Sequence, residues 1–152
     1  MLAADLIETL ETSPGVGLAA PQIGVALRVV VVDVARKPGE SGHGRVVLVD
    51  PVLLREGGDR TVREGCLSVP EYTANVRRAS AVTVSARDER GRAFSLIADG
   101  LEAVAIQHEI DHLDGILFLD RVANVQSDLF RRRPRRRPED VSPPPGARPT
   151  PA

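Results

Sequence analysis

Two histidines and a glutamate stand close together in the chain. His108 and His112 are four residues apart, so on a helix they lie one turn apart on the same face and can bind one metal ion. Glu109 follows the first histidine and is placed to reach a metal-bound water without being a ligand itself. This H-E-x-x-H spacing is typical of metal-assisted hydrolysis, in which two ligands hold the metal, a carboxylate acts as general base and a coordination position stays open for water.

A site of this type needs a third protein ligand, and the chain contains one cysteine, Cys66. With one cysteine no disulfide can form within the chain, which fits a reducing compartment where a thiol serves as a ligand or a nucleophile. The alternative is a buried cysteine that acts as a small apolar side chain. A nucleophilic cysteine would need a paired histidine, whereas both helix histidines are explained by metal binding. We therefore expect a Cys-His-His site with one open position.

Two more segments accompany the histidine segment. Gly15–Gly24 reads GVGLAAPQIG, and Glu64–Pro70 reads EGCLSVP. Together with Gln107–Gly115, which reads QHEIDHLDG, they resemble in content and order the three motifs of the peptide deformylases. The resemblance extends to about Asp120-Arg121 and so covers most of the chain.

The resemblance implies an enzyme that hydrolyses the N-formyl group of N-formylmethionine on nascent polypeptides and releases formate. It implies one divalent metal ion per chain, held by Cys66, His108 and His112. Fe²⁺ is the expected native ion, with Zn²⁺, Ni²⁺ or Co²⁺ as substitutes. A metal-bound hydroxide would attack the formyl carbon, with Glu109 as general base and then general acid. The ligand types alone do not select iron over zinc.

The resemblance also assigns the groups that stabilise the oxyanion. These are the side chain of Gln22 and the backbone N–H of Leu67. Negative charge develops on the former carbonyl oxygen as an amide is hydrolysed, and each fixed donor aimed at that oxygen contributes about 3–4 kcal/mol.

The peptide itself is expected to contact the glycine-rich motif, the cysteine motif and the histidine helix. The residues expected to bind it are Val16, Gly17, Gly65, Leu101, Val104 and Ala105. The last three share one helical stripe with His108 and His112. Without the other motifs, the stripe would be read as core and the glycine-rich segment as a simple turn.

Hydrophobic periodicity predicts an α+β fold in which small antiparallel or mixed β-sheets pack around a central helix carrying the H-E-x-x-H motif. The predicted helices are Leu2–Leu10 and Gly100–Leu113, and the predicted strands are Leu27–Val34, Val46–Val49, Arg77–Arg87 and Ala93–Ala98. We expect the strand from Val46 to stop at Asp50-Pro51. We also expect Glu102 to form a capping box with Asp99 at the start of the second helix.

The surroundings of three further residues can also be predicted. Asp111 is expected to support the metal site by pairing with Arg78, and the alternative is that both are charges facing solvent. His43 lies in a polar loop and is expected to be exposed.

Composition predicts one catalytic domain, residues 1–130, followed by an arginine- and proline-rich disordered tail, residues 131–152. Fourteen residues precede Gly15, a short N-terminal segment for this family, and we expect this to affect stability before chemistry. The net charge of -1 predicts no general attraction to nucleic acid. The arginine run in 131–137 could still contact the ribosome, although a solvated tail is the simpler interpretation. With neither a membrane span nor a targeting signal in the sequence, we expect a cytoplasmic protein.

Two alternative functions remain open at this point. One is a metallopeptidase, which would use the same H-E-x-x-H chemistry, although the candidate third ligand is an upstream cysteine. The other is a non-enzymatic relative that binds a partner through its arginine tail. Retention of Gln22, Cys66, Glu109 and both histidines favours an enzyme.

Overall fold

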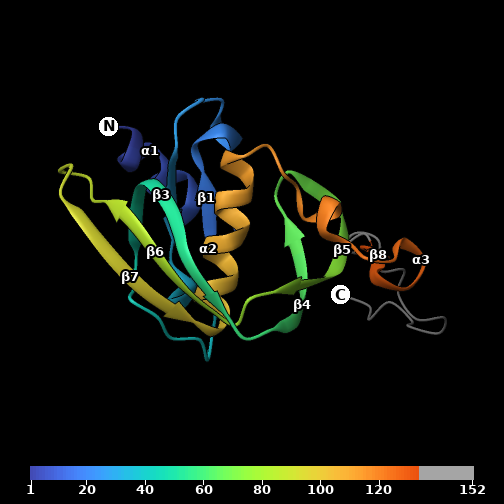
Figure 1. The fold of residues 1–152 in the computed structure, drawn as a ribbon. Coiled ribbons are helices and arrows are strands. Elements are labelled where there is room, and N and C mark those ends of the chain that lie inside the picture. The colour runs from blue at the N-terminus through green and yellow to red at the C-terminus, as the bar shows by residue number, and fades with distance from the viewer. Residues whose placement is uncertain (134–152) are drawn as a thin grey trace, which may run out of the picture.

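The computed structural model describes residues 1–133 and has the predicted α+β fold, with two antiparallel sheets on opposite sides of one long helix (Figure 1). The helices are α1 (Leu2–Glu11), α2 (Gly100–Leu113) and α3 (Val125–Asp128), with 3₁₀ turns η1 (Ala20–Ile23), η2 (Val34–Arg36) and η3 (Phe118–Arg121). The strands are β1 (Gly17–Ala19), β2 (Val29–Val32), β3 (Val46–Gly57), β4 (Arg60–Cys66), β5 (Val69–Arg78), β6 (Ala81–Arg87), β7 (Ala93–Asp99) and β8 (Leu129–Arg131). In the part of the chain described, no helix is long and apolar enough to cross a membrane.

The larger sheet has the strand order β1-β2-β3-β6-β7. Its strand β2 consists of four valines that are all buried, as the continuous β-branched run predicts. Val30 and Val32 face α2 and join the main core, whereas Val29 and Val31 face the other side and pack with α1. The predicted helix Leu2–Leu10 is confirmed as α1, and its Leu6 and Leu10 cover that second face.

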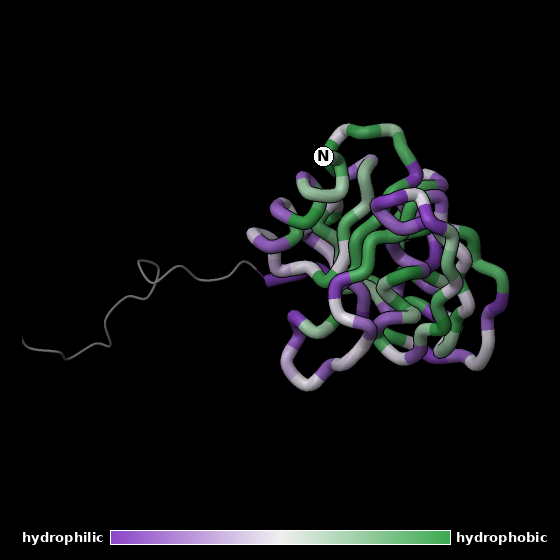
Figure 2. The backbone as a smooth tube through the Cα atoms, turned by 90° about the vertical axis from the view of Figure 1, so that its left-hand side faces the viewer, coloured by the Kyte–Doolittle hydropathy of each residue, from purple (hydrophilic) through white to green (hydrophobic). Residues whose placement is uncertain are grey.

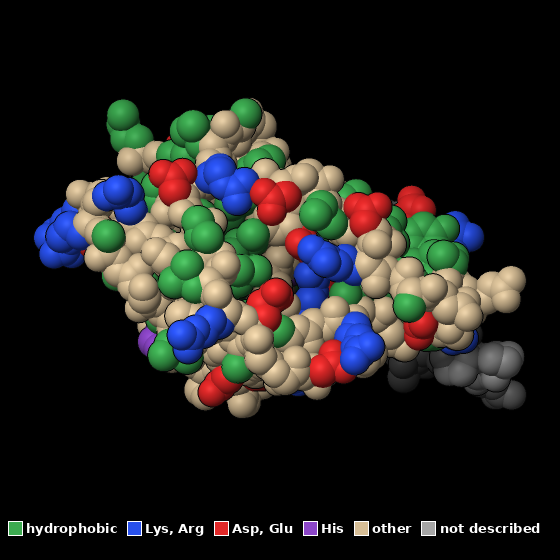
Figure 3. All heavy atoms as spheres, viewed as in Figure 1, with side chains coloured by type: hydrophobic (Ala, Val, Ile, Leu, Met, Phe, Trp, Pro, Cys, Tyr) green, Lys and Arg blue, Asp and Glu red, His purple; other side chains and the backbone are tan. Residues whose placement is uncertain are grey.

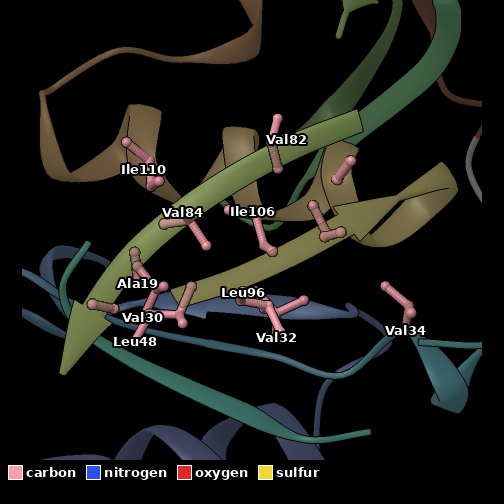
Figure 4. Packing of buried hydrophobic residues seen from close by; sticks show 14 residues of the cluster. Ala19, Val30, Val32, Val34, Leu48, Val82, Val84, Leu96, Ile106 and Ile110 are labelled. Carbon is pink, nitrogen blue, oxygen red and sulfur yellow. The ribbon is translucent and has the colours of Figure 1, made fainter. Parts of the chain in front are cut away.

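The main core lies between the larger sheet and α2. Figure 4 shows Val82 and Val84 of β6 and Leu96 of β7 pointing toward Ile106 and Ile110 of the helix. The hydrophobic segments cross the middle of the molecule, and most hydrophilic segments form peripheral loops (Figure 2). Burial of a single valine, leucine or isoleucine contributes about 1.5–3 kcal/mol, so this layer fixes α2 against the sheet.

The smaller sheet has the order β4-β5-β8 and lies on the opposite side of α2 (Figure 1). Its buried positions include Glu64 and Arg78 as well as the apolar Ala74 and Val76. Because charged residues occupy part of the inner face, the alternation of apolar and polar residues is weak. For that reason hydrophobic periodicity did not predict β4 or the greater part of β5.

The strand from Val46 does not stop at Asp50-Pro51, so that prediction was wrong. β3 continues to Gly57, and its pairing with β6 is irregular between Val49 and Val52. Asp50 adopts a positive φ of 49°, which bends the strand there. The irregularity accommodates Pro51, which has no backbone N–H to donate.

The predicted strand Arg77–Arg87 is in fact parts of two strands in different sheets. β5 ends at Arg78 and β6 begins at Ala81. Between them, the side-chain amide of Gln107 on α2 accepts from the N–H of Ala79 at 3.1 Å and donates to its carbonyl at 2.9 Å. This contact holds the crossing between the sheets directly against the central helix. The predicted return strand Ala93–Ala98 is confirmed as β7.

Helix α2 has the predicted bounds, but the predicted capping box is wrong. Asp99 occupies the N-cap position and makes no side-chain capping hydrogen bond. The buried Glu102 instead accepts from the backbone N–H of His43 at 2.8 Å and contacts the His43 ring at 2.7 Å. His43 is exposed, as predicted, and its loop is fastened to the first turn of α2.

The predicted boundary between the domain and the tail falls within β8. Arg131 pairs with Tyr72 in the smaller sheet, and the N–H of Arg132 donates to the carbonyl of Glu71 at 2.7 Å. The rest of the predicted tail, residues 134–152, lies outside the described residues.

Candidate metal centre

Three potential metal ligands converge between α2 and the smaller sheet. The ligand atoms of Cys66, His108 and His112 all lie within 4.8 Å of one another. Cys66 comes from the end of β4, and the two histidines come from successive turns of α2, as their spacing predicts. Cys66 Sγ lies 3.2 Å from Nε2 of His112.

This geometry fits a single divalent ion. Ligands at the usual bond lengths around a tetrahedral ion are about 3.5 Å apart, and Cys66 Sγ and His112 Nε2 are 3.2 Å apart. One thiolate and two imidazoles form a ligand set suited to zinc, iron, nickel or cobalt. Three protein ligands leave a position for water or substrate, which is the arrangement of catalytic sites.

The surroundings of Cys66 favour its thiolate form. Burial disfavours the charged form, but hydrogen bonds from His108, His112 and the backbone N–H of Ser68 outweigh burial and lower the pKa of Cys66 to about 5. The thiolate is therefore the stable form at neutral pH, and the thiolate is the form that binds metal.

His108 is oriented by a buried carboxylate. Its Nδ1 lies 2.8 Å from Oε2 of Glu64, which leaves Nε2 to face Cys66. Burial opposes the charged imidazole, but its interactions with Cys66 and Glu64 outweigh burial and raise the pKa of His108 to about 10. Since a metal ligand must be unprotonated, metal binding would release a proton from this cluster.

Glu64 belongs to a buried network of charged groups on the same side of α2. Arg78 donates to Glu64 at 2.7 and 3.0 Å and to Asp111 at 2.6 Å. Arg121 donates to the same Asp111 at 2.9 and 2.5 Å. The predicted pairing of Arg78 with Asp111 is therefore confirmed, and both side chains are buried. Asp111, Arg78 and Glu64 form a chain of contacts that ends at His108, one of the candidate metal ligands.

Glu109 lies directly below the backbone of Gly17. A Cβ atom at Gly17 would collide with the Glu109 carboxylate, so the glycine-rich motif allows the strand β1 to pass over this group. Within the described residues, Oε2 of Glu109 is buried and has no hydrogen-bond partner. Burial raises the pKa of Glu109 to about 7, although His108 and His112 oppose the shift. Such a carboxyl can both accept and return a proton near neutral pH.

Gln22 presents its amide nitrogen to the site. The N–H of Ala19 donates to Gln22 Oε1 at 2.9 Å, which fixes the orientation of the amide. Gln22 Nε2 in turn donates to Ser68 Oγ at 3.1 Å and lies 3.8 Å from Cys66 Sγ. Leu67, the other predicted oxyanion donor, is next to Cys66 in the chain, and its exposed side chain faces Gly15 across the site.

A cavity of about 410 Å³ opens onto this centre. Cys66, His108 and Glu109 contribute to its wall, whereas His112 does not and lies behind them. The other lining residues include every predicted peptide-binding residue and both predicted oxyanion donors: Val16, Gly17, Gly65, Leu101, Val104, Ala105, Gln22 and Leu67. All the predicted site residues except His112 therefore line one cavity, and His112 lies beside Cys66 and His108.

The glycine-rich wall of the cavity is held in place by Arg36. Its guanidinium donates to the carbonyls of Gly15 at 3.1 Å and Ser13 at 2.9 Å, and also to those of Leu10 and Glu11. These contacts satisfy carbonyls at the end of α1 and fix the segment that leads into β1.

Three residues of the centre were not predicted from the sequence. Glu64 and Ser68 lie within the cysteine motif, beside the predicted ligand Cys66, and Arg121 lies at the end of the segment that resembles the family. For Glu64 a signal existed, because a histidine ligand usually has a carboxylate or carbonyl partner on its other ring nitrogen. For Arg121 the sequence offered no spacing that could link it to Asp111.

Comparisons with known proteins agree with the motifs. The family model described as polypeptide deformylase matches residues 1–128. The peptide deformylase of Syntrophobacter fumaroxidans is 46% identical over 132 residues, which cover 87% of this chain and 76% of the relative. The crystal structure of a peptide deformylase from Legionella pneumophila superposes with a TM-score of 0.74 at 42% identity, over 82% of this chain and 72% of that one. A class I type b peptide deformylase from Acinetobacter baumannii, solved with Met-Ala-Ser bound, gives a TM-score of 0.75 at 37% identity, over 80% and 79% of the two chains.

Proposed function

The chain belongs to the polypeptide deformylase family of hydrolases, and on that premise we propose that Cys66, His108 and His112 hold the metal with which it removes the formyl group from N-formylmethionyl nascent peptides. One observation carries the proposal. Three ligand atoms lie within 4.8 Å of one another, and two of the ligand residues, Cys66 and His108, line the cavity together with Glu109, whose buried Oε2 has no partner among residues 1–133.

We propose Fe²⁺ as the native ion because the family resemblance implies it, and the ligand set also accepts Zn²⁺, Ni²⁺ or Co²⁺. When bound, the ion lowers the pKa of a water molecule and polarises the formyl oxygen. Glu64 keeps His108 in the tautomer that points Nε2 at the ion.

Glu109 is the proposed proton carrier. Its raised pKa lets it take a proton from the attacking water and deliver it to the departing amine within one turnover. The proposal is supported by the contact between Glu109 and Gly17, both of which line the cavity.

Gln22 and the backbone N–H of Leu67 are the proposed oxyanion donors. The amide of Gln22 is held by Ala19 with its nitrogen toward Cys66, so it is oriented before substrate binds. A donor that needs no reorientation stabilises the developing charge most effectively.

The methionine side chain is proposed to enter the apolar part of the cavity formed by Leu101, Val104 and Ala105 of α2. Val16, Gly17 and Gly65 are proposed to contact the peptide backbone. The Acinetobacter relative was solved with Met-Ala-Ser, the tripeptide that deformylation of formyl-Met-Ala-Ser would leave. We propose that this chain accepts the same class of peptide.

We place the protein in the cytoplasm because its proposed substrates are nascent chains and its ligand thiol requires a reducing environment. Ribosome contact through the arginine-rich tail remains a prediction. Deleting residues 134–152 leaves β8 in place and removes three of the six arginines in 131–137. Loss of salt-sensitive ribosome binding would support the contact, and unchanged binding would refute a contact through the deleted residues.

The test of the proposed function is hydrolysis of formyl-Met-Ala-Ser by protein purified without oxygen and loaded with Fe²⁺ or Ni²⁺. Acetyl-Met-Ala-Ser and unblocked Met-Ala-Ser serve as matched substrates. We expect formate release from the first peptide and no cleavage of its internal bonds. Cleavage between Met and Ala would indicate a metallopeptidase, and no product from any peptide despite bound metal would indicate a non-enzymatic relative.

A further inference from the structure

We infer that Lys37, Arg63 and Arg132 form a cationic rim at the cavity mouth that selects peptides carrying a carboxylate in the residues after the formylmethionine. All three residues line the same cavity as the candidate metal centre, and all three are exposed. The inference deepens the proposed function, because it concerns which peptides the site prefers.

Arg132 contacts the residue that precedes the candidate ligand Cys66. It follows β8, an outer strand of the smaller sheet, and its side chain passes over β5 to reach Gly65 on β4. A Cβ atom at Gly65 would collide with the Arg132 guanidinium, so that guanidinium lies against the residue that precedes the ligand Cys66. The contact needs both the strand β8 and a glycine at position 65.

The two groups that hold Arg63 in place are uncharged, so they do not neutralise its positive charge. Its Nε donates to Asn75 Oδ1 at 2.9 Å, and its guanidinium carbon lies 3.4 Å from the centre of the Phe130 ring. These contacts come from β5 and β8, so β8 supports two cations of the rim. Lys37 comes from a different part of the chain, just after η2.

The acidic groups of the same cavity do not neutralise the rim. Glu64 and Glu109 are both buried. Glu64 is paired with Arg78 and His108, and Glu109 faces the candidate metal ligands. In residues 1–133, neither Lys37, Arg63 nor Arg132 forms an ion pair with a carboxylate. The accessible charge at the cavity mouth is therefore positive, although the whole chain carries a net charge of -1.

The reach of an extended peptide fits this arrangement. A peptide advances about 3.3 Å per residue, so if its formyl group lies at the candidate metal ligands, the residues after the methionine extend along the cavity that Lys37, Arg63 and Arg132 also line. A carboxylate there could come from an aspartate or glutamate side chain or from the free end of a short peptide. A guanidinium binds either in the same way, through paired N–H groups.

The experiment compares four peptides in the holoenzyme. Formyl-Met-Ala-Asp-amide against formyl-Met-Ala-Asn-amide isolates a side-chain carboxylate, and formyl-Met-Ala-Ser as acid against amide isolates a terminal one. We expect the acidic member of each pair to have the higher kcat/KM, by roughly threefold for each cation engaged, and the ratio to fall as salt is added. A ratio of one at low salt, or a preference for the neutral member, would overturn the inference.

Two variants test whether the preference for acidic peptides depends on the rim. Arg132→Gln should reduce the acid-to-neutral ratio, whereas Arg131→Gln removes the same charge one residue away, outside the cavity lining, and should leave the ratio unchanged. Equal effects of the two variants would mean that only overall charge matters and would overturn the inference.

A binding measurement separates this result from the proposed function. The deformylated products Met-Ala-Asp-amide and Met-Ala-Asn-amide can be titrated without any turnover. Tighter binding of the aspartate peptide, lost in Arg132→Gln, would support the rim even if deformylation failed. Turnover of formyl-Met-Ala-Asn-amide without any acidic preference would support the proposed function and refute the rim.

Discussion

The two faces of α2 are both buried, but they have different roles. One face packs Ile106 and Ile110 against the valines of the larger sheet, and its contacts are almost entirely apolar (Figure 4). The other face carries His108, Asp111 and His112 toward the smaller sheet, where the buried partners are charged. The contacts of the apolar face fix the position of the helix. The polar face carries candidate metal ligands and a charged group that supports them.

This contrast explains why burial alone does not locate the functional residues. Charges that are buried without partners cost several kcal/mol, so the carboxylates of Glu64 and Asp111 persist only because Arg78 and Arg121 compensate them. On the surface the rule is different. Figure 3 shows basic and acidic side chains interspersed on one face of the molecule, where solvent screens them.

Replacing Cys66, the candidate metal ligand that β4 brings to the polar face of α2, should have the largest effect. Cys66→Ser substitutes a hydroxyl that is not ionised near neutral pH for a thiolate ligand. We expect the affinity for metal to fall by more than the roughly 10- to 100-fold that a supporting residue contributes, with turnover lost in parallel. Metal content after gel filtration measures metal binding, and circular dichroism measures whether the variant is folded. A variant that keeps wild-type metal affinity would remove Cys66 from the ligand set.

Removing Arg78, the buried cation of β5 that pairs with the polar face of α2, should reduce stability most. Arg78→Ala leaves Glu64 and Asp111 buried beside fewer partners, and we expect a loss of about 3–5 kcal/mol in the free energy of unfolding. Denaturant titration measures it. Arg77→Ala is the matched control, because the neighbouring Arg77 pairs with Asp59 in solvent, and no change in its unfolding midpoint is expected. Equal midpoints for the two variants would contradict the account of the buried network.

Truncating the apolar face should affect stability without affecting chemistry. Ile106→Ala creates a cavity beneath the larger sheet and should cost about 2–5 kcal/mol. The folded fraction should keep the wild-type kcat and metal content. Ile97→Ala, on the exposed side of the same sheet, should change stability by no more than about 0.5 kcal/mol. A large fall in kcat for Ile106→Ala at temperatures where it is fully folded would show that the two faces are not separable.

The smallest expected effect is that of the support for His108. Glu64→Gln keeps the shape of the side chain but removes the charge that orients the imidazole. Metal affinity should weaken by about 10- to 100-fold, measured by competition with a chelator. Glu89→Gln, in the exposed turn between β6 and β7, is the control. If both variants bind metal equally well, Glu64 serves the fold and not the ligand.

The residues that could be predicted from the sequence are those whose type and spacing are dictated by chemistry. Two histidines one helical turn apart, an adjacent glutamate and a single cysteine indicate a metal site by their identity and order in the chain. The α+β class and α2 followed from periodicity, because Leu101, Val104 and Ala105 share one helical stripe with His108 and His112.

The parts that escaped prediction are those where tertiary contacts override local patterns. Strand β4 has a charged residue, Glu64, at a buried position, so its apolar alternation is too weak to detect. The irregularity at Asp50 depends on the positive φ of that residue. The following proline permits this conformation, but no pattern in the sequence predicts it. Arg132 was placed in a tail by composition, and only the pairing of β8 with β5 brings it to the cavity.

The most direct test of the central claim is a comparison of wild-type protein with Glu109→Gln at equal metal content, using formyl-Met-Ala-Ser as substrate. The substitution keeps the size of the side chain and leaves Cys66, His108 and His112 intact. We predict one metal ion per chain in both proteins and a kcat in the variant that is lower by about 10²- to 10⁴-fold. A variant that binds metal and hydrolyses the peptide at the wild-type rate would contradict the claim that Glu109 carries the proton beside this metal centre.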